Sequence, residues 1–156
     1  LYRGIETSVA LTMWDLTFSA AVATMRGDIR GYDGITYPAR RIPPPFGTFG
    51  LRYEPSWRGT WGEFGLRWAG HQGRLHPSDA KDLRLCETEP FSGTLRNPCD
   101  GTPGWATLHL RGGWQITRSL GLVLALDNLT DQHYRSHGSG LDGPGFDLRS
   151  TLHLRF

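Results

Sequence analysis

The end of the chain alternates strictly between apolar and polar side chains. Between residues 146 and 156 the even positions are apolar except for Ser150, and the odd positions are Asp147, Arg149, Thr151, His153 and Arg155. Successive side chains of a β-strand point to opposite faces, so this segment predicts a strand with one apolar and one charged face. A length of ~10 residues is also what a tilted strand needs to cross the hydrocarbon core of a membrane. The segment therefore indicates a sheet with two unlike faces, either an outer-membrane barrel or half of a soluble sandwich.

Six further segments show strand character, and each is bounded by Gly, Pro, Asp or Asn. The composition, with 21 Gly, 10 Pro and 12% aromatic residues, is typical of a β-rich chain. No run approaches the ~18 apolar residues of a membrane helix. We expect an all-β fold, an antiparallel up-and-down meander of about seven transmembrane strands. The predicted strands are 3–13, 16–25, 47–54, 60–69, 105–116, 120–128 and 146–156.

The connections between the predicted strands alternate between short and long. In an antiparallel meander every second connection lies at the same end, so the short turns share one rim and the long loops share the other. Outer-membrane barrels have this asymmetry, with short periplasmic turns and longer extracellular loops, whereas sandwiches have no reason to sort loop lengths. The pattern predicts the outer membrane of a Gram-negative cell, with the long loops extracellular and the short turns periplasmic.

Aromatic residues lie near both predicted rims. Trp14, Trp57 and Trp61 fall at or near short turns, and Trp68, Trp105 and Tyr134 lie near the ends of long loops. Amphipathic rings prefer the headgroup level at both membrane surfaces, which favours a barrel. The alternative is that these are ordinary core aromatics of a soluble sheet.

An odd number of strands cannot close an antiparallel barrel. Seven strands leave two unpaired edges, which hydrocarbon does not tolerate. We therefore expect that further strands are missing from this chain, or that the chain assembles with others.

Cys86 and Cys99 are the only cysteines, and they bracket a stretch rich in turn-forming residues. A disulfide that staples this loop is the first interpretation, and it would place the loop in an oxidising compartment. The alternative is two free thiols. A metal site is disfavoured because neither cysteine belongs to a Cys-x-x-Cys pair.

The charge pattern and the motifs exclude several functions. The formal net charge is +2 and the basic residues are scattered, so we expect no nucleic-acid partner. Hydrolase, zinc-protease and phosphate-loop motifs are absent, so we expect no enzymatic activity, cofactor or resident metal. Polar residues of the long loops are candidates for ligand contact, with solvated loop residues as the alternative. These candidates are His71, Arg74, His76, His133 and His137.

The segment 126–134 reads Leu-Asp-Asn-Leu-Thr-Asp-Gln-His-Tyr and is followed by Gly143-Pro144-Gly145 and the alternating strand. Asn128, Leu129, Asp131 and Tyr134 form the pattern Asn-Leu-x-Asp-x-x-Tyr. With this pattern, residues 126–156 resemble the C-terminal end of a TonB-dependent outer-membrane receptor. This resemblance implies that Leu152, Leu154 and the terminal Phe156 form a signal for the barrel-assembly machinery. Arg41-Ile-Pro-Pro and the strand with Arg52 and Tyr53 also resemble the family, and Phe146 departs from its usual Arg.

The resemblance implies that residues 1–156 are part of a 22-stranded barrel, without the plug and the N-terminal strands. The implied partners are outer-membrane lipid, the remainder of the barrel and its plug, the TonB complex acting through that plug, and the barrel-assembly machinery. The implied function is uptake of a scarce small molecule such as a metal chelate, in the class of ferric siderophores, haem or cobalamin. The alternative is a small surface β-domain, adhesin-like or a non-TonB outer-membrane protein, that binds a partner through its disulfide-stapled loop.

Overall fold

The computed structural model describes residues 1–56, 59–80, 82, 84–86 and 99–156. Eight strands form one antiparallel sheet in the order β1-β2-β4-β5-β6-β7-β8, and the short β3 pairs with β2 outside this path. This confirms the predicted all-β meander. The strands are β1 (Tyr2–Met13), β2 (Leu16–Arg30), β3 (Thr36–Pro38), β4 (Phe46–Tyr53), β5 (Thr60–Ala69), β6 (Trp105–Gln115), β7 (Leu120–Asp127) and β8 (Asp147–Leu154), with one 3-10 turn, η1 (Pro77–Asp79).

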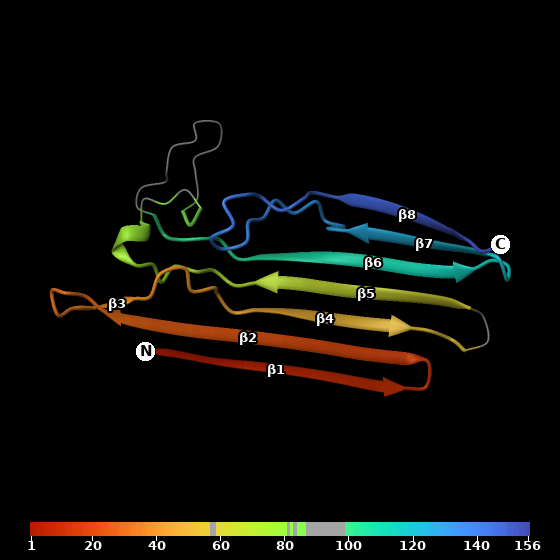
Figure 1. Ribbon diagram of the computed structural model, residues 1–156, viewed down its shortest axis with the longest axis horizontal. Coiled ribbons are helices and arrows are strands. Elements are labelled where there is room, and N and C mark those ends of the chain that lie inside the picture. Colours follow the sequence, from red (N-terminus) through yellow and green to blue (C-terminus); the bar gives the residue numbers. More distant parts are fainter. Residues whose placement is uncertain (57–58, 81, 83, 87–98) are drawn as a thin grey trace.

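The connections are sorted by length as predicted. The three short turns lie at one end of the sheet and the three long connections at the other, and the C-terminus lies at the short-turn end (Figure 1). In the described part of the chain β1 pairs only with β2 and β8 only with β7, so the sheet is open at both edges. No helix among the described residues is long and apolar enough to cross a membrane.

The second strand is longer than the sequence pattern predicted. β2 continues to Arg30 and forms a hairpin with β3, within the segment that we expected to be an irregular connection. A backbone hydrogen bond from the Gly31 amide to the Ile35 carbonyl closes the turn. Within the turn Gly34 has a φ of 79°, in the region that favours glycine. Asp33 accepts a hydrogen bond from the Ile35 amide, as expected of an Asx turn. The dipeptide Asp33-Gly34 is a hairpin signal that the sequence analysis did not use.

An apolar row crosses the entire sheet. One register line joins residues from all seven long strands: Leu11, Phe18, Leu51, Phe64, Leu110, Leu126 and Leu148. None of the described residues covers this face, because Leu11, Leu51, Phe64, Leu110 and Leu148 remain 40–59% exposed. An apolar surface that runs across a whole sheet marks an interaction with another protein or with a membrane.

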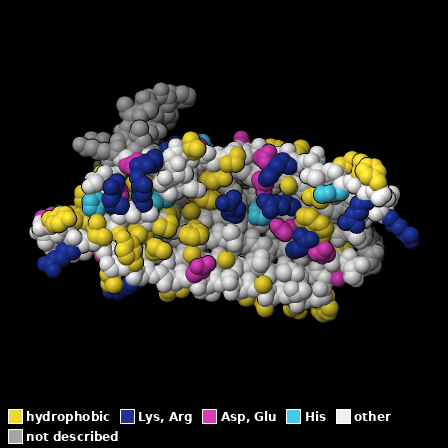
Figure 2. Space-filling view, in the orientation of Figure 1, with side chains coloured by type: hydrophobic (Ala, Val, Ile, Leu, Met, Phe, Trp, Pro, Cys, Tyr) yellow, Lys and Arg dark blue, Asp and Glu magenta, His cyan; other side chains and the backbone are white. Residues whose placement is uncertain are grey.

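The next register line carries the charged residues. It runs through Thr17, Arg52, Glu63, Arg111, Ala125 and Arg149. Arg52 pairs with Glu54 at 2.9 Å and with Glu63 at 3.6 Å, and Arg111 pairs with Asp127 at 2.9 Å. Figure 2 shows side chains of both charges gathered over the middle strands. The two faces of the sheet therefore differ as the alternation predicted.

Two of the tryptophans that we expected at the headgroup level lie on the charged face instead. Trp61 and Trp105 occupy the same alternate positions of β5 and β6 as Glu63 and His109. The Arg52 guanidinium stacks 4.0 Å from the centre of the Trp61 ring, and the Trp105 ring packs 4.5 Å from that of Tyr134. The headgroup prediction was wrong for these two residues, and Trp57 lies outside the described residues.

Burial is concentrated in the long connections. The buried hydrophobic residues of the described chain are Ala39, Ile42, Leu85 and Cys86, and none belongs to a strand. The buried polar residues Gln72, Asp79, Thr102 and Asn128 lie in the same connections, and the buried Thr107 lies in β6. The protein thus packs its own core at the long-loop end, whereas the sheet leaves its apolar face open.

Candidate functional site

The three long connections, residues 31–45, 70–104 and 128–146, pack against one another, and we call their described residues the loop cluster. The β5–β6 connection touches both neighbours. Toward the β2–β4 connection, Gln72 donates a hydrogen bond to the Ile42 carbonyl at 2.8 Å. Toward the β7–β8 connection, the Thr102 hydroxyl lies 2.8 Å from Nδ1 of His137. The cluster is therefore held from both sides by polar contacts between distant segments.

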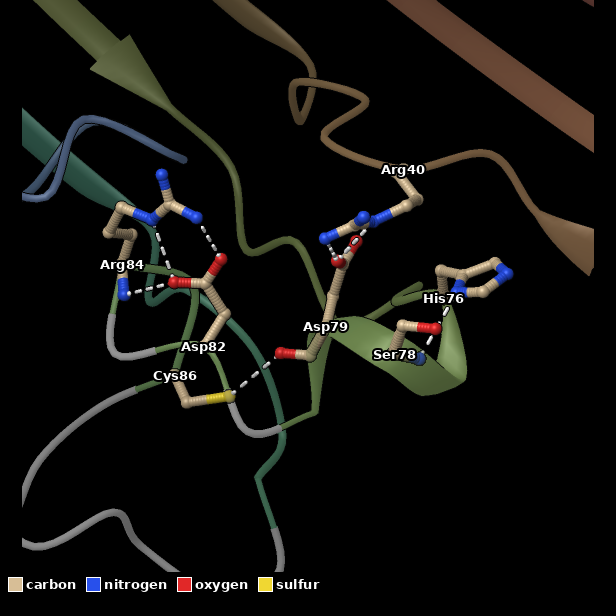
Figure 3. A network of polar contacts seen from close by, with 7 residues as sticks. All are labelled: Arg40, His76, Ser78, Asp79, Asp82, Arg84 and Cys86. Carbon is tan, nitrogen blue, oxygen red and sulfur yellow. Dashed lines mark hydrogen bonds and ion pairs between the residues drawn. The ribbon is translucent and has the colours of Figure 1, made fainter.

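An ion pair between a buried carboxylate and a half-exposed arginine stands at the centre of the contacts in Figure 3. Asp79, at the end of η1, is 1% exposed, and its Oδ1 accepts from Nε of Arg40 at 2.7 Å and lies 2.6 Å from Nη2. Its Oδ2 has no hydrogen-bond partner among the described residues. Removing one partner of such a pair leaves a buried charge and is strongly destabilising. Arg40 and Asp79 thus fasten the β5–β6 connection to the β3–β4 segment.

A disulfide joins Cys86 and Cys99, with their Cα atoms 5.5 Å apart, a usual distance for such a bond. The Cys86 sulfur lies 3.7 Å from the Asp79 carbonyl oxygen, as Figure 3 shows, but a disulfide sulfur carries no proton to donate. Asp82 follows η1 and is held by Arg84 through two side-chain hydrogen bonds of 2.8 and 2.6 Å. These bonds lower the pKa of Asp82 to about 2. The start of the disulfide loop is therefore ordered by covalent and charged contacts.

Two of the predicted ligand candidates hold the β5–β6 connection in place. His76 caps η1, because its Nδ1 accepts from the Ser78 amide at 3.1 Å, and its ring centre lies 5.4 Å from that of Tyr37. Arg74 donates to the Gly27 carbonyl at 3.1 Å and pairs with Asp28. Both side chains thus bind the loop to β2 and β3.

The other candidates differ in exposure. His71 is exposed at the start of the loop. The His133 side chain is 83% exposed, with Nε2 3.2 Å from Asp142, whose pKa is lowered mainly by its hydrogen bond with Arg135. His137 is half-buried, and burial lowers its pKa while the charge of Asp79 partly opposes this. No three metal-ligating side chains come together among the residues that the structure describes.

The segment after β7, which carries the family motif, forms a clasp across the base of its loop. Asn128, with φ 51°, donates from Nδ2 to the Gln132 carbonyl at 2.9 Å and to the Pro144 carbonyl at 3.0 Å, and its Oδ1 accepts from the Gln132 amide at 3.0 Å. Asp131, with φ 49°, accepts from the Phe146 amide at 2.8 Å. The motif therefore positions the loop and the start of β8.

The remaining motif residues also have defined places. Leu129 continues the pairing beyond β7, with its amide donating to the Leu108 carbonyl at 2.9 Å. The Tyr134 ring lies so close to Gly143 that a Cβ there would approach its Cζ to 2.1 Å, so only glycine fits. Leu152, Leu154 and Phe156 lie at the short-turn end and are 60%, 59% and 117% exposed.

Sequence reasoning named His137 as a candidate for ligand contact but missed the residue pairs that lock the loop cluster. Arg40 and Asp79 are 39 positions apart and Thr102 and His137 are 35 positions apart, with no periodicity that links them. No local signal could have found these pairs, since each depends on how the loops pack. Tyr37 is a partial exception, because its position next to the Asp33-Gly34 turn follows from the hairpin.

Comparisons with known proteins agree with this geometry. The model of the TonB dependent receptor-like β-barrel family matches residues 2–129, so it covers the strands before the segment 126–156 that carried most of the resemblance. No curated protein matches the sequence. Similar solved structures are the copper transporter OprC, at 20% identity and a TM-score of 0.72, and the FrpB iron transporter from Neisseria meningitidis, at 16% and 0.69. A mutant of the ferric enterobactin receptor PfeA from Pseudomonas aeruginosa gives 16% and 0.66.

These three structures cover 98%, 99% and 98% of the chain, respectively, and the chain covers 23%, 24% and 22% of theirs. The chain thus spans about a quarter of the length of each. At these identities the structural similarity supports the fold alone. The family match covers most of the sequence and therefore supports the family. The chain belongs to the TonB-dependent receptor β-barrel family.

Proposed function

We propose that residues 1–156 form the C-terminal part of the barrel of a TonB-dependent outer-membrane transporter. The observation that carries this proposal is the apolar row from Leu11 to Leu148, which crosses all seven long strands and which no described residue covers. Hydrocarbon is the partner that such a face fits, because the alternate positions hold paired charges that suit an aqueous interior. The family match favours this function over a small surface β-domain.

The energetics support apolar side chains facing lipid. With the opposite orientation Arg111 and Arg149 would face lipid, at roughly 2–4 kcal/mol for an arginine near the bilayer midplane. The proposed orientation has the long loops outside the cell and the short turns in the periplasm. The Cys86–Cys99 disulfide would then lie outside the cell, where disulfides persist.

The loop cluster is the proposed ligand-facing part of this piece of barrel. We propose that the transported molecule is a metal chelate, in the class of ferric siderophores, haem or cobalamin. The three similar structures are a copper transporter, an iron transporter and a ferric enterobactin receptor, which supports a metal-containing ligand. His71 and His133 are the exposed candidates for contact, whereas Arg74, His76 and His137 act by holding the loops together.

The proposed partners follow from the open edges and the exposed end of the sheet. β1 and β8 would pair with the remaining strands of the barrel, and the charged face would surround its plug, through which the TonB complex acts. Outer-membrane lipid would cover the apolar face. Leu152, Leu154 and Phe156 would present β8 to the barrel-assembly machinery, consistent with their high exposure.

A matched pair of cysteine variants tests the membrane assignment in the full-length receptor. Leu110 and Arg111 are neighbours on β6 whose side chains point to opposite faces. In membranes, a lipid-soluble probe should label Leu110→Cys and spare Arg111→Cys, and a charged thiol reagent should show weaker labelling of Leu110→Cys. Equal labelling of both positions by the lipid-soluble probe would contradict the proposed orientation.

A growth assay tests the ligand class separately. Cells that depend on the full-length receptor are supplied with one compound at a time: a ferric siderophore or haem as the sole source of iron, cobalamin as the sole source of that vitamin, or a copper chelate as the sole source of copper. Receptor-dependent growth on one metal chelate is expected. Receptor-dependent uptake of a metal-free ligand alone would contradict the proposed class and leave the barrel assignment unchanged.

A further inference from the structure

The apolar face of β1 and β2 ends in arginines at the long-loop end. In the β1–β2 register Leu11 pairs with Phe18, Val9 with Ala20, Ile5 with Thr24 and Arg3 with Arg26. The register is continuous, so Arg3 and Arg26 project from the same face as the apolar residues. Two arginines therefore stand directly opposite each other where the apolar band stops.

This pair carries unbalanced positive charge. Like charges directly opposite on neighbouring strands are destabilising unless an anion lies nearby. Oδ2 of Asp28 lies 3.8 Å from Nε of Arg26, and Oδ1 of the same carboxylate pairs with Arg74, so a single negative charge is shared between two arginines. The Arg26 side chain is 70% exposed, and Arg30 adds another exposed positive charge at the end of β2. Among the described residues, one shared carboxylate therefore leaves net positive charge beside Arg3 and Arg26, which favours an external anion.

The position of the pair matches the depth of lipid headgroups. Leu16 begins the apolar run of β2 at the short-turn end, and Arg26 lies ~10 residues further along the strand. At ~3.3 Å per residue and a tilt of ~40° this corresponds to a height of about 25 Å, the height of the apolar band of an outer-membrane barrel. If Leu16 lies at one boundary of the hydrocarbon, Arg3 and Arg26 lie at the other.

We propose that Arg3 and Arg26 form a binding site for the phosphate group of an anionic lipid in the leaflet that surrounds the long-loop end. Planar guanidinium groups bind phosphate oxygens in a bidentate manner, and a phosphate between the two would remove their mutual repulsion. The acyl chains of the same lipid would cover Ile5 and Val22, both exposed on this face. This inference rests on the proposed insertion of the barrel in a membrane.

The test uses the full-length receptor purified in detergent, with native mass spectrometry of bound lipid. The probes are bisphosphorylated lipid A and the same lipid without its phosphates. The wild type should retain the phosphorylated lipid more tightly than the dephosphorylated one. The double variant R3Q/R26Q should bind the phosphorylated lipid about 25-fold more weakly, at about fivefold per arginine near a membrane surface. The matched control R118Q changes an exposed arginine in the short turn before β7 and should bind as the wild type does.

Several outcomes would overturn the site. Unchanged retention in R3Q/R26Q, an equal loss in R118Q, or equal binding of the dephosphorylated lipid would each contradict it. Displacement of the lipid by 10 mM inorganic phosphate, with no preference for the lipid, would assign the arginines to a free anion. The labelling of Leu110→Cys separates the lipid site from the proposed function. If the lipid-soluble probe labels Leu110→Cys and R3Q/R26Q retains lipid as the wild type does, the lipid site is contradicted and the proposed function stands.

Discussion

The clasp at Asn128 gives the sharpest prediction for the loop after β7. We expect Asn128→Ala to open this loop in the full-length receptor while the sheet stays folded. The side chain makes three hydrogen bonds, to Gln132 and Pro144, from a position that is 5% exposed. It also has a φ of 51°, in a region that asparagine tolerates better than alanine.

The magnitude follows from these contacts. Three hydrogen bonds at about 1 kcal/mol each, with about 1 kcal/mol for alanine in the left-handed conformation, give a loss of about 4 kcal/mol in local stability. Asn128→Gly loses the same hydrogen bonds and tolerates the positive φ, so its loss should be about 3 kcal/mol. The difference between the two variants isolates the backbone contribution.

Hydrogen exchange of the 129–146 peptide, followed by mass spectrometry in detergent micelles, measures the effect. Because about 1.4 kcal/mol corresponds to a factor of ten, the alanine variant should exchange up to about 1,000-fold faster in this loop, and peptides from β4 and β5 should be unchanged. Exchange within tenfold of the wild type would refute the clasp. Equal exchange in the alanine and glycine variants would refute the backbone contribution.

Three further predictions concern the loop cluster. Arg40→Ala should weaken the packing of the loop cluster by about 3 kcal/mol, because Asp79 then stays buried without its cation. The double variant Arg40→Ala/Asp79→Ala should recover part of this loss. The protease resistance of the loops measures both variants, and an equal loss in the two would contradict the role of the ion pair. Burial lowers the pKa of His137 below 6.5, so the unfolded loop binds more protons than the folded one as the pH falls. Loop stability should therefore be complete above pH 6.5 and decline below it, and His137→Gln should remove this slope in exchange rates; an unchanged slope would show that another group is responsible. Replacing Cys86 and Cys99 with serine should lower the stability of the loop by about 3 kcal/mol, while the thermal unfolding of the barrel stays as in the wild type. An equal loss of stability in the barrel would show that the disulfide supports the sheet as well.

Much of the sheet could be predicted because its signal is local. A period of two assigns each side chain to a face, and turn residues mark where strands reverse, so the order of the seven long strands and the two faces followed from short windows of sequence. The extension of β2 to Arg30 was missed because Gly27 and Gly31 interrupt its alternation. Trp61 and Trp105 were placed at the headgroup level from their position along the chain, although their alternation with Leu66 and Leu108 already assigned them to the charged face.

The loop cluster could be predicted only in outline. The histidines were recognised as loop residues, but their separate roles, His76 as a cap and His137 as a buried partner of Thr102, depend on neighbours that the sequence places far away. The family motif was recognised from residues 126–134, and its physical meaning appeared only when Asn128 reached the carbonyl of Pro144.

By itself, the sequence determined the alternating faces, the antiparallel order and the sorting of loops to two rims, because each of these depends on neighbouring residues and on the geometry of a single strand. The tertiary structure decided which polar groups of the loops are buried, which are exposed, and which arginines stand opposite each other at the end of the apolar band. A polar side chain such as Asp79 is buried only where the packed loops supply its partner, and that partner, Arg40, is chosen by contacts between segments far apart in the chain.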